Sequence, residues 1–157
     1  MIAGSPVRAR GLLPPGGMRT VKVSDLMTPR VVSIRDDASL TNVDWEMTLA
    51  EVRHVPVVDE QDKVVGIVSD RDVLRSLNRH DRSRVPVSTI MTLLPVMVRP
   101  QTAARDALEM MLARKINAIP VVDEGGALVG IVTATDFLEL AYRALAGMPV
   151  DIERARA

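Results

Sequence analysis

The sequence places a hydroxyl and a carboxylate three residues apart at two positions, Ser69 with Asp72 and Thr133 with Asp136. A carboxylate accepts several hydrogen bonds, and a hydroxyl can donate one to an anion such as a phosphate. Each pair follows an apolar run and opens a helical stretch, and the N-terminus of a helix favours an anion. The same spacing is also a helix-capping arrangement, which stabilises a fold by about 1 kcal/mol without any ligand. Spacing alone leaves both roles open.

The two pairs belong to an internal duplication. Val57-Val58-Asp59-Glu60 returns 64 residues later as Val121-Val122-Asp123-Glu124. Val65-Gly66-Ile67-Val68 returns at the same distance as Val129-Gly130-Ile131-Val132. From Val23/Val87 to Leu74/Leu138 the copies align over 52 positions without a gap, and 18 of these are identical. The chain therefore contains two copies of one structural unit.

Three strands are expected in each copy. Alternation and β-branched residues predict them at Val31–Ile34, Val55–Val58 and Val64–Val68, and at the equivalent Val96–Val98, Ile119–Val122 and Leu128–Val132.

Two helices complete each copy and give the order β-α-β-β-α. The buried face of the first helix is expected to carry Leu40, Val43 and Met47, and in the second copy Ala104, Ala107, Leu108, Met111 and Leu112. The last helix is expected at about Asp70–Leu77 and at about Ala134–Ala144.

A unit of about 50 residues rarely buries enough surface to be stable alone. We therefore expect an α+β fold in which two β-α-β-β-α repeats pack sheet against sheet around a pseudo-two-fold axis, with two related clefts between them. Clefts at internal interfaces favour small ligands. The expected organisation is a flexible leader (1–18), a first repeat (19–78), a linker (79–86), a second repeat (87–144) and a C-terminal tail (145–157).

The composition argues against several kinds of site. Lys plus Arg and Asp plus Glu number 20 each, and a zero net charge argues against binding of nucleic acid. There is no cysteine, and the two histidines, His54 and His80, match no metal-ligand spacing. No apolar run approaches the roughly 20 residues of a membrane helix, and the leader lacks the apolar core of a signal peptide. A cytoplasmic protein without a metal is expected.

No catalytic motif is present either: the sequence has no phosphate-binding loop, no Gly-x-Ser-x-Gly and no His-x-x-x-His. We therefore expect a protein that is not an enzyme and requires no cofactor.

The chain resembles the CBS-domain family in its paired form, the Bateman module. The resemblance covers about Val23 to Leu140. It rests on Pro56-Val57-Val58-Asp59 with Val65-Gly66-Ile67-Val68-Ser69, and on Pro120-Val121-Val122-Asp123 with Val129-Gly130-Ile131-Val132-Thr133, each followed by its Asp. The resemblance implies a regulatory module that senses a small molecule.

In the family, the Ser/Thr-x-x-Asp element contacts the phosphate and the ribose of a nucleotide. The resemblance therefore gives these contacts to Ser69, Asp72, Thr133 and Asp136. The chemistry fits, because an Asp carboxylate can accept hydrogen bonds from both ribose hydroxyls.

Basic residues just before the second strand reach the phosphates in nucleotide-binding members of the family, which points here to Arg53 and His54. Arg71 is a further cation beside the expected phosphate. The second copy has the uncharged Asn117-Ala118 instead, so two sites would differ in their preference for phosphate charge. The alternative is that both arginines are solvated cations and that His54 is a partly buried polar residue.

The resemblance also implies that the adenine is held by apolar residues of the first strand and of the hydrophobic-Pro segment. The candidates are Val31, Val55, Pro56, Val96, Ile119 and Pro120. Plain core packing is the alternative for each of them.

Trp45, the only tryptophan, replaces Glu109 of the other copy and is expected to face outward. Because an exposed Trp often marks an interface, and CBS pairs commonly dimerise through helices, we expect Trp45 at a homodimer contact. The expected function is allosteric: an adenine nucleotide (AMP, ADP or ATP) binds between the repeats, and an effector protein responds in trans. The alternatives are a ligand-free dimerisation module, or a sensor of S-adenosylmethionine or NAD.

Overall fold

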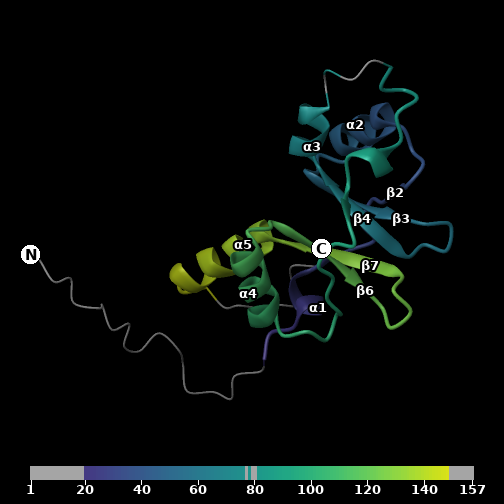
Figure 1. Ribbon diagram of the computed structural model, residues 1–157. Helices are drawn as coiled ribbons and strands as arrows, with labels where there is room; N and C mark the ends of the chain where they lie inside the picture. The colour runs from purple at the N-terminus through teal and green to yellow at the C-terminus, as the bar shows by residue number, and fades with distance from the viewer. Residues whose placement is uncertain (1–19, 77, 79–80, 149–157) are drawn as a thin grey trace, which may run out of the picture.

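The computed structural model describes residues 20–76, 78 and 81–148, and it forms two lobes (Figure 1). The first lobe contains β2 (Ile34–Arg35), α2 (Leu40–Leu49), β3 (His54–Val58), β4 (Val64–Ser69), α3 (Asp70–Arg75), the 3-10 turn η1 (Val87–Thr89) and β5 (Thr92–Leu93). The second contains α1 (Val23–Leu26), β1 (Thr28–Pro29), α4 (Ala104–Arg114), β6 (Ala118–Val122), β7 (Leu128–Thr133) and α5 (Ala134–Leu145). The predicted leader and residues 149–157 of the predicted tail lie outside the described residues.

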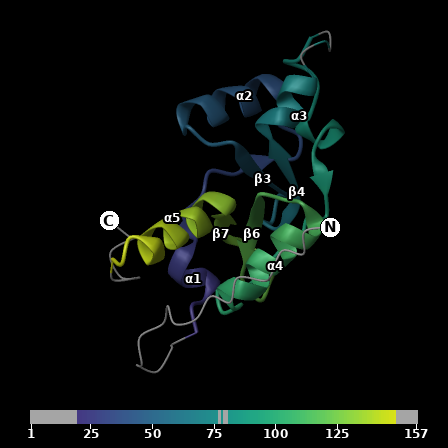
Figure 2. The same cartoon turned by 90° about the vertical axis from the view of Figure 1, so that its left-hand side faces the viewer.

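The two sheets face each other between layers of helices. In Figure 2 the layers run from α2 and α3 through β3 and β4, then β6 and β7, to α4 and α5. The strand orders are β2-β3-β4-β5 and β1-β7-β6. In each lobe the central hairpin is antiparallel, and its two strands pair at equivalent positions, His54 with Ser69 and Ala118 with Thr133. The predicted α+β fold of two repeats is confirmed.

The first segment of each repeat packs in the lobe that the rest of the other repeat forms. β1 pairs with β7, and β5 pairs with β4, both antiparallel. Val23 is fully buried in the core of the second lobe, whereas its repeat-mate Val87 is fully buried in the core of the first. The repeats in the sequence therefore do not coincide with the lobes in space. This exchange of first segments connects the two lobes through strand pairing.

The lobes also meet at the tips of their hairpins. Val58, Val64 and Val122 form a small buried cluster there, with Leu128 packed against it. The duplication extends to the backbone, because positive φ angles recur 64 residues apart at Arg30 and Leu94, Glu51 and Lys115, and Asp62 and Gly126. The two repeats therefore share their local backbone conformation as well as their sequence, in keeping with a pseudo-two-fold arrangement.

Several expected elements differ in the structure. Val31 and Val32 precede β2 instead of belonging to it, and the strand predicted at Val96–Val98 is reduced to a single bridge from Val98 to Val121. The helix expected from Asp70 ends at Arg75 because Ser76 caps it.

Leu112 is 73% exposed, because the buried face of α4 is narrower than predicted. It is centred on Ala104, Ala107 and Met111, so that Leu112 lies at its edge. α1, β1, η1 and β5 were not expected, since elements of two to four residues carry no periodic signal.

Candidate functional site

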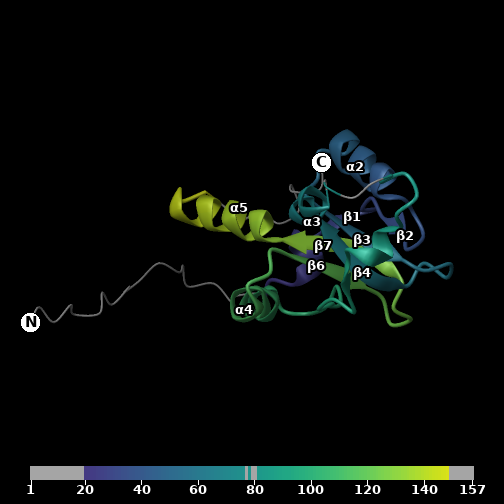
Figure 3. The same ribbon diagram turned by 45° about the horizontal axis from the view of Figure 1, so that its top comes forward.

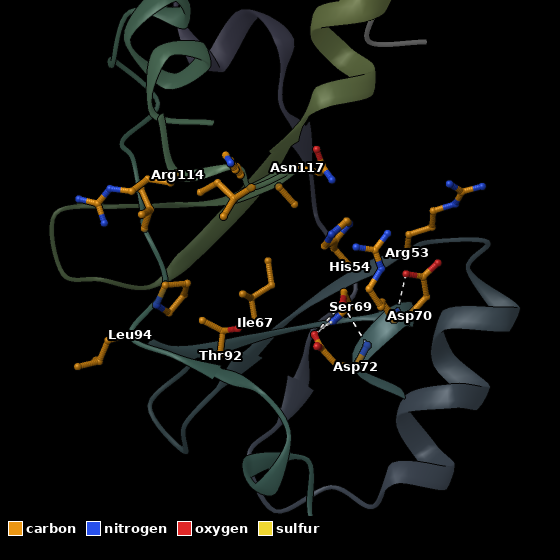
Figure 4. Close-up of a pocket in the computed structure, with 16 residues that line it drawn as sticks. Arg53, His54, Ile67, Ser69, Asp70, Asp72, Thr92, Leu94, Arg114 and Asn117 are labelled. Atoms are coloured by element: carbon orange, nitrogen blue, oxygen red, sulfur yellow. Dashed lines mark hydrogen bonds between the residues drawn. The ribbon is translucent and has the colours of Figure 1, made fainter. Parts of the chain in front are cut away.

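Two clefts open between the lobes. The first, here the Ser69 cleft, has a volume of about 550 Å³. Its lining residues are Arg53, His54, Ile67, Ser69–Asp72, Thr92, Leu94–Val96 and Arg114–Ala118 (Figure 4). The second, here the Thr133 cleft, has a volume of about 640 Å³ and is lined by Thr28, Val31, Val32, Glu51–His54, Asn117, Ile131 and Thr133–Thr135. Most of these positions are related by the 64-residue shift, so the predicted pair of related clefts is present.

The hydroxyl and carboxylate of the Ser69 cleft form a complete helix cap. Asp72 Oδ2 accepts hydrogen bonds from the Ser69 backbone N–H at 3.0 Å and from Ser69 Oγ at 2.6 Å. Ser69 Oγ in turn accepts one from the Asp72 backbone N–H at 3.3 Å. All side-chain bonds of Asp72 end on Oδ2, so Oδ1 has no partner within the described part of the chain. The capping role predicted as one alternative is present, and it leaves one carboxylate oxygen available.

Thr133 and Asp136 repeat this cap in the second lobe. Asp136 Oδ2 accepts hydrogen bonds from the Thr133 N–H at 2.6 Å and from Oγ1 at 2.9 Å. Burial raises the pKa of Asp136, and the hydrogen bonds from Thr133 act against this rise. Unlike Asp72, Asp136 lines neither cleft. The two equivalent carboxylates are therefore placed differently relative to the open space.

The position of Arg53 and His54 follows from the hairpin. His54 pairs with Ser69 across β3 and β4, and the Asp70 N–H donates to the Arg53 carbonyl at 2.9 Å. Figure 4 shows both side chains at the Ser69 end of the cleft, with Arg114 at the opposite end. Arg53 and His54 also line the Thr133 cleft, as does Asn117. The predicted basic pair is therefore shared by the two clefts rather than belonging to one of them.

The two clefts carry different charges, a difference that was not predicted from the sequence. Arg114 and Lys115 at the end of α4 line the Ser69 cleft, whereas their repeat-mates are Ala50 and Glu51. Of these two only Glu51 lines the Thr133 cleft. A comparison of charges between the copies would have found this reversal. The Ser69 cleft is therefore the more favourable of the two for an anion.

His54 lines both clefts, and its protonation depends on its surroundings. Its pKa is lowered from the ordinary 6.5, first because burial penalises the charged imidazolium, while Asp70 and Asp72 act in the opposite direction and Arg53 lowers it further. Since the unfolded chain takes up this proton at higher pH than the folded protein does, the free energy of unfolding falls as the pH drops below 6.5.

We expect the His54→Gln variant to lose less stability than the wild type between about pH 7 and pH 5.5, because it lacks this titrating group. Urea unfolding at the two pH values measures the difference. Equal losses in the two proteins would show that His54 does not contribute to the pH dependence.

Other predicted site residues lie apart from the clefts. Val55, Pro56, Ile119 and Pro120 are fully buried core residues and line neither cleft, so the packing alternative describes them in this structure. Val31 lines the Thr133 cleft, and Arg71 and Val96 line the Ser69 cleft. Trp45 is 67% exposed on α2, as expected.

No group of three or more His, Cys, Asp or Glu side chains among the described residues is arranged to hold a metal ion. In the same residues, no helix has the length and apolar character needed to cross a membrane.

The fold and the clefts are those of a CBS-domain pair. The CBS-domain family model matches residues 23–79 and 87–143, and the chain therefore belongs to the CBS-domain family. The expected family is confirmed, with two tandem domains.

Similar solved structures are themselves CBS-type proteins. A protein assigned to acetoin utilization (AcuB) from Vibrio cholerae is 32% identical with a TM-score of 0.72, over 82% of this chain and 95% of that chain. CBSX2, a CBS-pair protein from Arabidopsis thaliana, is 30% identical in its crystal structure with AMP. The TM-score to that complex is 0.69, over 78% of this chain and 97% of that chain.

Some sequence relatives are longer enzymes. The inosine-5'-monophosphate dehydrogenase of Methanocaldococcus jannaschii is 29% identical in an alignment 150 residues long, which covers 87% of this chain and 29% of the enzyme. The chain spans 24% of a homoserine O-acetyltransferase from Methanohalobium evestigatum. The chain thus covers less than a third of the length of these relatives.

Proposed function

We propose that this CBS pair is a regulatory module that binds an adenine nucleotide in the Ser69 cleft. The observation that carries the proposal is the combination of the open Asp72 Oδ1, the Ser69 hydroxyl and a surplus of cations around one cleft. Oδ1 would accept hydrogen bonds from the ribose, while Arg53 and Arg71 would face the phosphate. Ile67 and Val96 offer apolar contacts for the base.

The size of the cleft and the similar structures support this proposal. A volume of about 550 Å³ lies within the range of roughly 300–1,000 Å³ typical of small-molecule sites. CBSX2, which is 30% identical, was crystallised in complex with AMP. We also propose that the protein acts in the cytoplasm.

Calorimetric titration of the purified protein with AMP, ADP and ATP tests the proposal. We expect saturable binding of at least one of them, weakened by salt because the phosphate meets exposed cations. S-adenosylmethionine and NAD serve as comparison ligands that share the adenosine part. Absence of binding by all three nucleotides would reject the proposal and favour the ligand-free interaction module.

We further propose that the protein acts as a homodimer on an effector protein in trans. A ligand between the lobes can bias their arrangement only by binding one arrangement more tightly than another. The outer helices carry exposed apolar side chains that suit such contacts, among them Trp45 and Leu49 on α2 and Leu138, Tyr142 and Leu145 on α5. α5 also projects beyond the body of the protein (Figure 3).

Replacing Trp45 with serine is expected to shift the protein toward the monomer, because a large exposed apolar side chain would be lost from the contact. Sedimentation measures the change. The matched control is Leu112→Ser, which replaces an exposed leucine on α4. An unchanged mass in Trp45→Ser would place the contact elsewhere.

A further inference from the structure

The two clefts share one cationic corner, formed by Arg53 and His54. These residues lie beside Ser69, through the pairing of His54 with Ser69 and the hydrogen bond from the Asp70 N–H to the Arg53 carbonyl. They also line the Thr133 cleft together with Thr133. An anion in either cleft that approaches its hydroxyl residue would therefore draw on the same guanidinium.

The remaining charges are unequal. Beyond the shared corner, the Ser69 cleft has Arg71, Arg114 and Lys115 against Asp70 and Asp72. The Thr133 cleft has Glu51 as its only other charged lining residue among those described. Once an anion in the Ser69 cleft has engaged Arg53, the described lining of the Thr133 cleft offers the Glu51 carboxylate and no further Arg or Lys.

Near neutral pH, His54 does not supply the positive charge that the Thr133 cleft lacks. Burial lowers its pKa, so the imidazole is mostly uncharged there. A phosphate in the Thr133 cleft would then have only the shared Arg53 guanidinium among the described lining cations, beside a first phosphate that already contacts it. Each phosphate carries a charge of about −1.5 to −2. Two phosphates close to a shared corner repel each other, and the repulsion is strongest where water is partly excluded.

We infer that the pair takes two classes of ligand at once: a phosphorylated adenine nucleotide in the Ser69 cleft and an uncharged adenine nucleoside in the Thr133 cleft. This inference rests on the proposed function. The Thr133 cleft keeps a volume of about 640 Å³. Its apolar lining from Val31, Val32 and Ile131 suits a base, and the side chains of Thr133 and Asn117 offer hydrogen bonds to a sugar. Binding of a second nucleotide is weakened by charge rather than by lack of space.

Calorimetric titrations with AMP and with adenosine test the inference. In the wild type, one AMP binds per chain, and a second binds at least about tenfold more weakly. Protein saturated with AMP still binds one adenosine. Two equal AMP sites in the wild type, or failure of adenosine to bind the AMP-loaded protein, would overturn the inference while leaving the proposed function intact.

The matched variant is Glu51→Lys, which copies the residue found at the equivalent position 115. The backbone tolerates lysine there, since φ is +53° at Glu51 and +54° at Lys115. We expect the second AMP to bind Glu51→Lys at least about tenfold more tightly than the wild type. Glu51→Gln is the milder second variant and is expected to change in the same direction.

The control is Glu60→Gln, an exposed residue of the β3–β4 turn, which should leave both titrations unchanged. An unchanged second site in both Glu51 variants would contradict the role of that carboxylate and the inference with it. No AMP binding to any of the proteins would instead reject the proposed function itself.

Discussion

The Asp72→Ala variant is expected to bind AMP at least about a hundredfold more weakly than the wild type. The carboxylate would accept hydrogen bonds from the ribose hydroxyls, and hydrogen bonds to a charged group contribute about 1.5–3 kcal/mol each. The variant also loses the helix cap formed with Ser69, at a cost of about 1 kcal/mol in stability. Calorimetric titration measures the affinity, and urea unfolding measures the stability.

Asp136→Ala is the matched control for this experiment. Asp136 caps α5 as Asp72 caps α3, so a similar loss of stability is expected. Because Asp136 lines neither cleft, its replacement should leave AMP affinity nearly unchanged. If both variants lose stability equally and neither loses affinity, the two carboxylates serve only as caps.

The Gly130→Ala variant is expected to unfold with a free energy about 1–3 kcal/mol lower than that of the wild type. A Cβ at this position would lie 2.9 Å from the Thr28 carbonyl oxygen and 2.9 Å from Met27 Sδ. Both atoms belong to the segment that the first repeat lends to the second lobe, and β1 pairs with β7 here. The backbone oxygen cannot move without breaking that pairing. Urea unfolding measures the loss.

Gly66→Ala should also destabilise the protein, since Met91 and the first residue of β5, Thr92, lie against Gly66 in the same way. Gly125→Ala is the control, because its nearest neighbour is the Asp123 side chain at 3.3 Å in an exposed turn. Equal stability of Gly130→Ala and Gly125→Ala would mean that the exchanged strand is not held closely against β7.

Much of this fold was predictable because the same pattern of residues occurs twice in the sequence. The strands that became β3, β4, β6 and β7 were expected within one residue at each end, since each is a β-branched run bounded by polar turns. The buried positions Leu40, Val43 and Met47 were predicted from helical spacing and are confirmed. The 64-residue repeat then implied the two-lobed arrangement.

The exchange of the first segments was not predictable from the same signals. β1 and β5 are two residues long, so they show no alternation. Their pairing depends on Gly66 and Gly130. A glycine in a strand permits a close approach of another backbone but does not indicate which segment approaches.

The charge of the site was only partly predictable. Arg53 and His54 were singled out, but their position between both clefts depends on the packing of the lobes. Lys115 was overlooked because it lies in the helix-terminal turn of the other repeat, 43 residues beyond Asp72 in sequence. Contacts between the repeats are tertiary, and the spacing of neighbouring residues does not indicate them.

The most direct test of the central claim is a titration of isotope-labelled protein with AMP, followed through the backbone amide chemical shifts. We expect the largest shifts at Ser69, Asp70 and Arg71, with further changes at the facing residues Lys115 and Asn117. The outer helix α5 should change little. No shifts at saturating AMP, or shifts confined to α2 and α5, would contradict nucleotide binding in the Ser69 cleft.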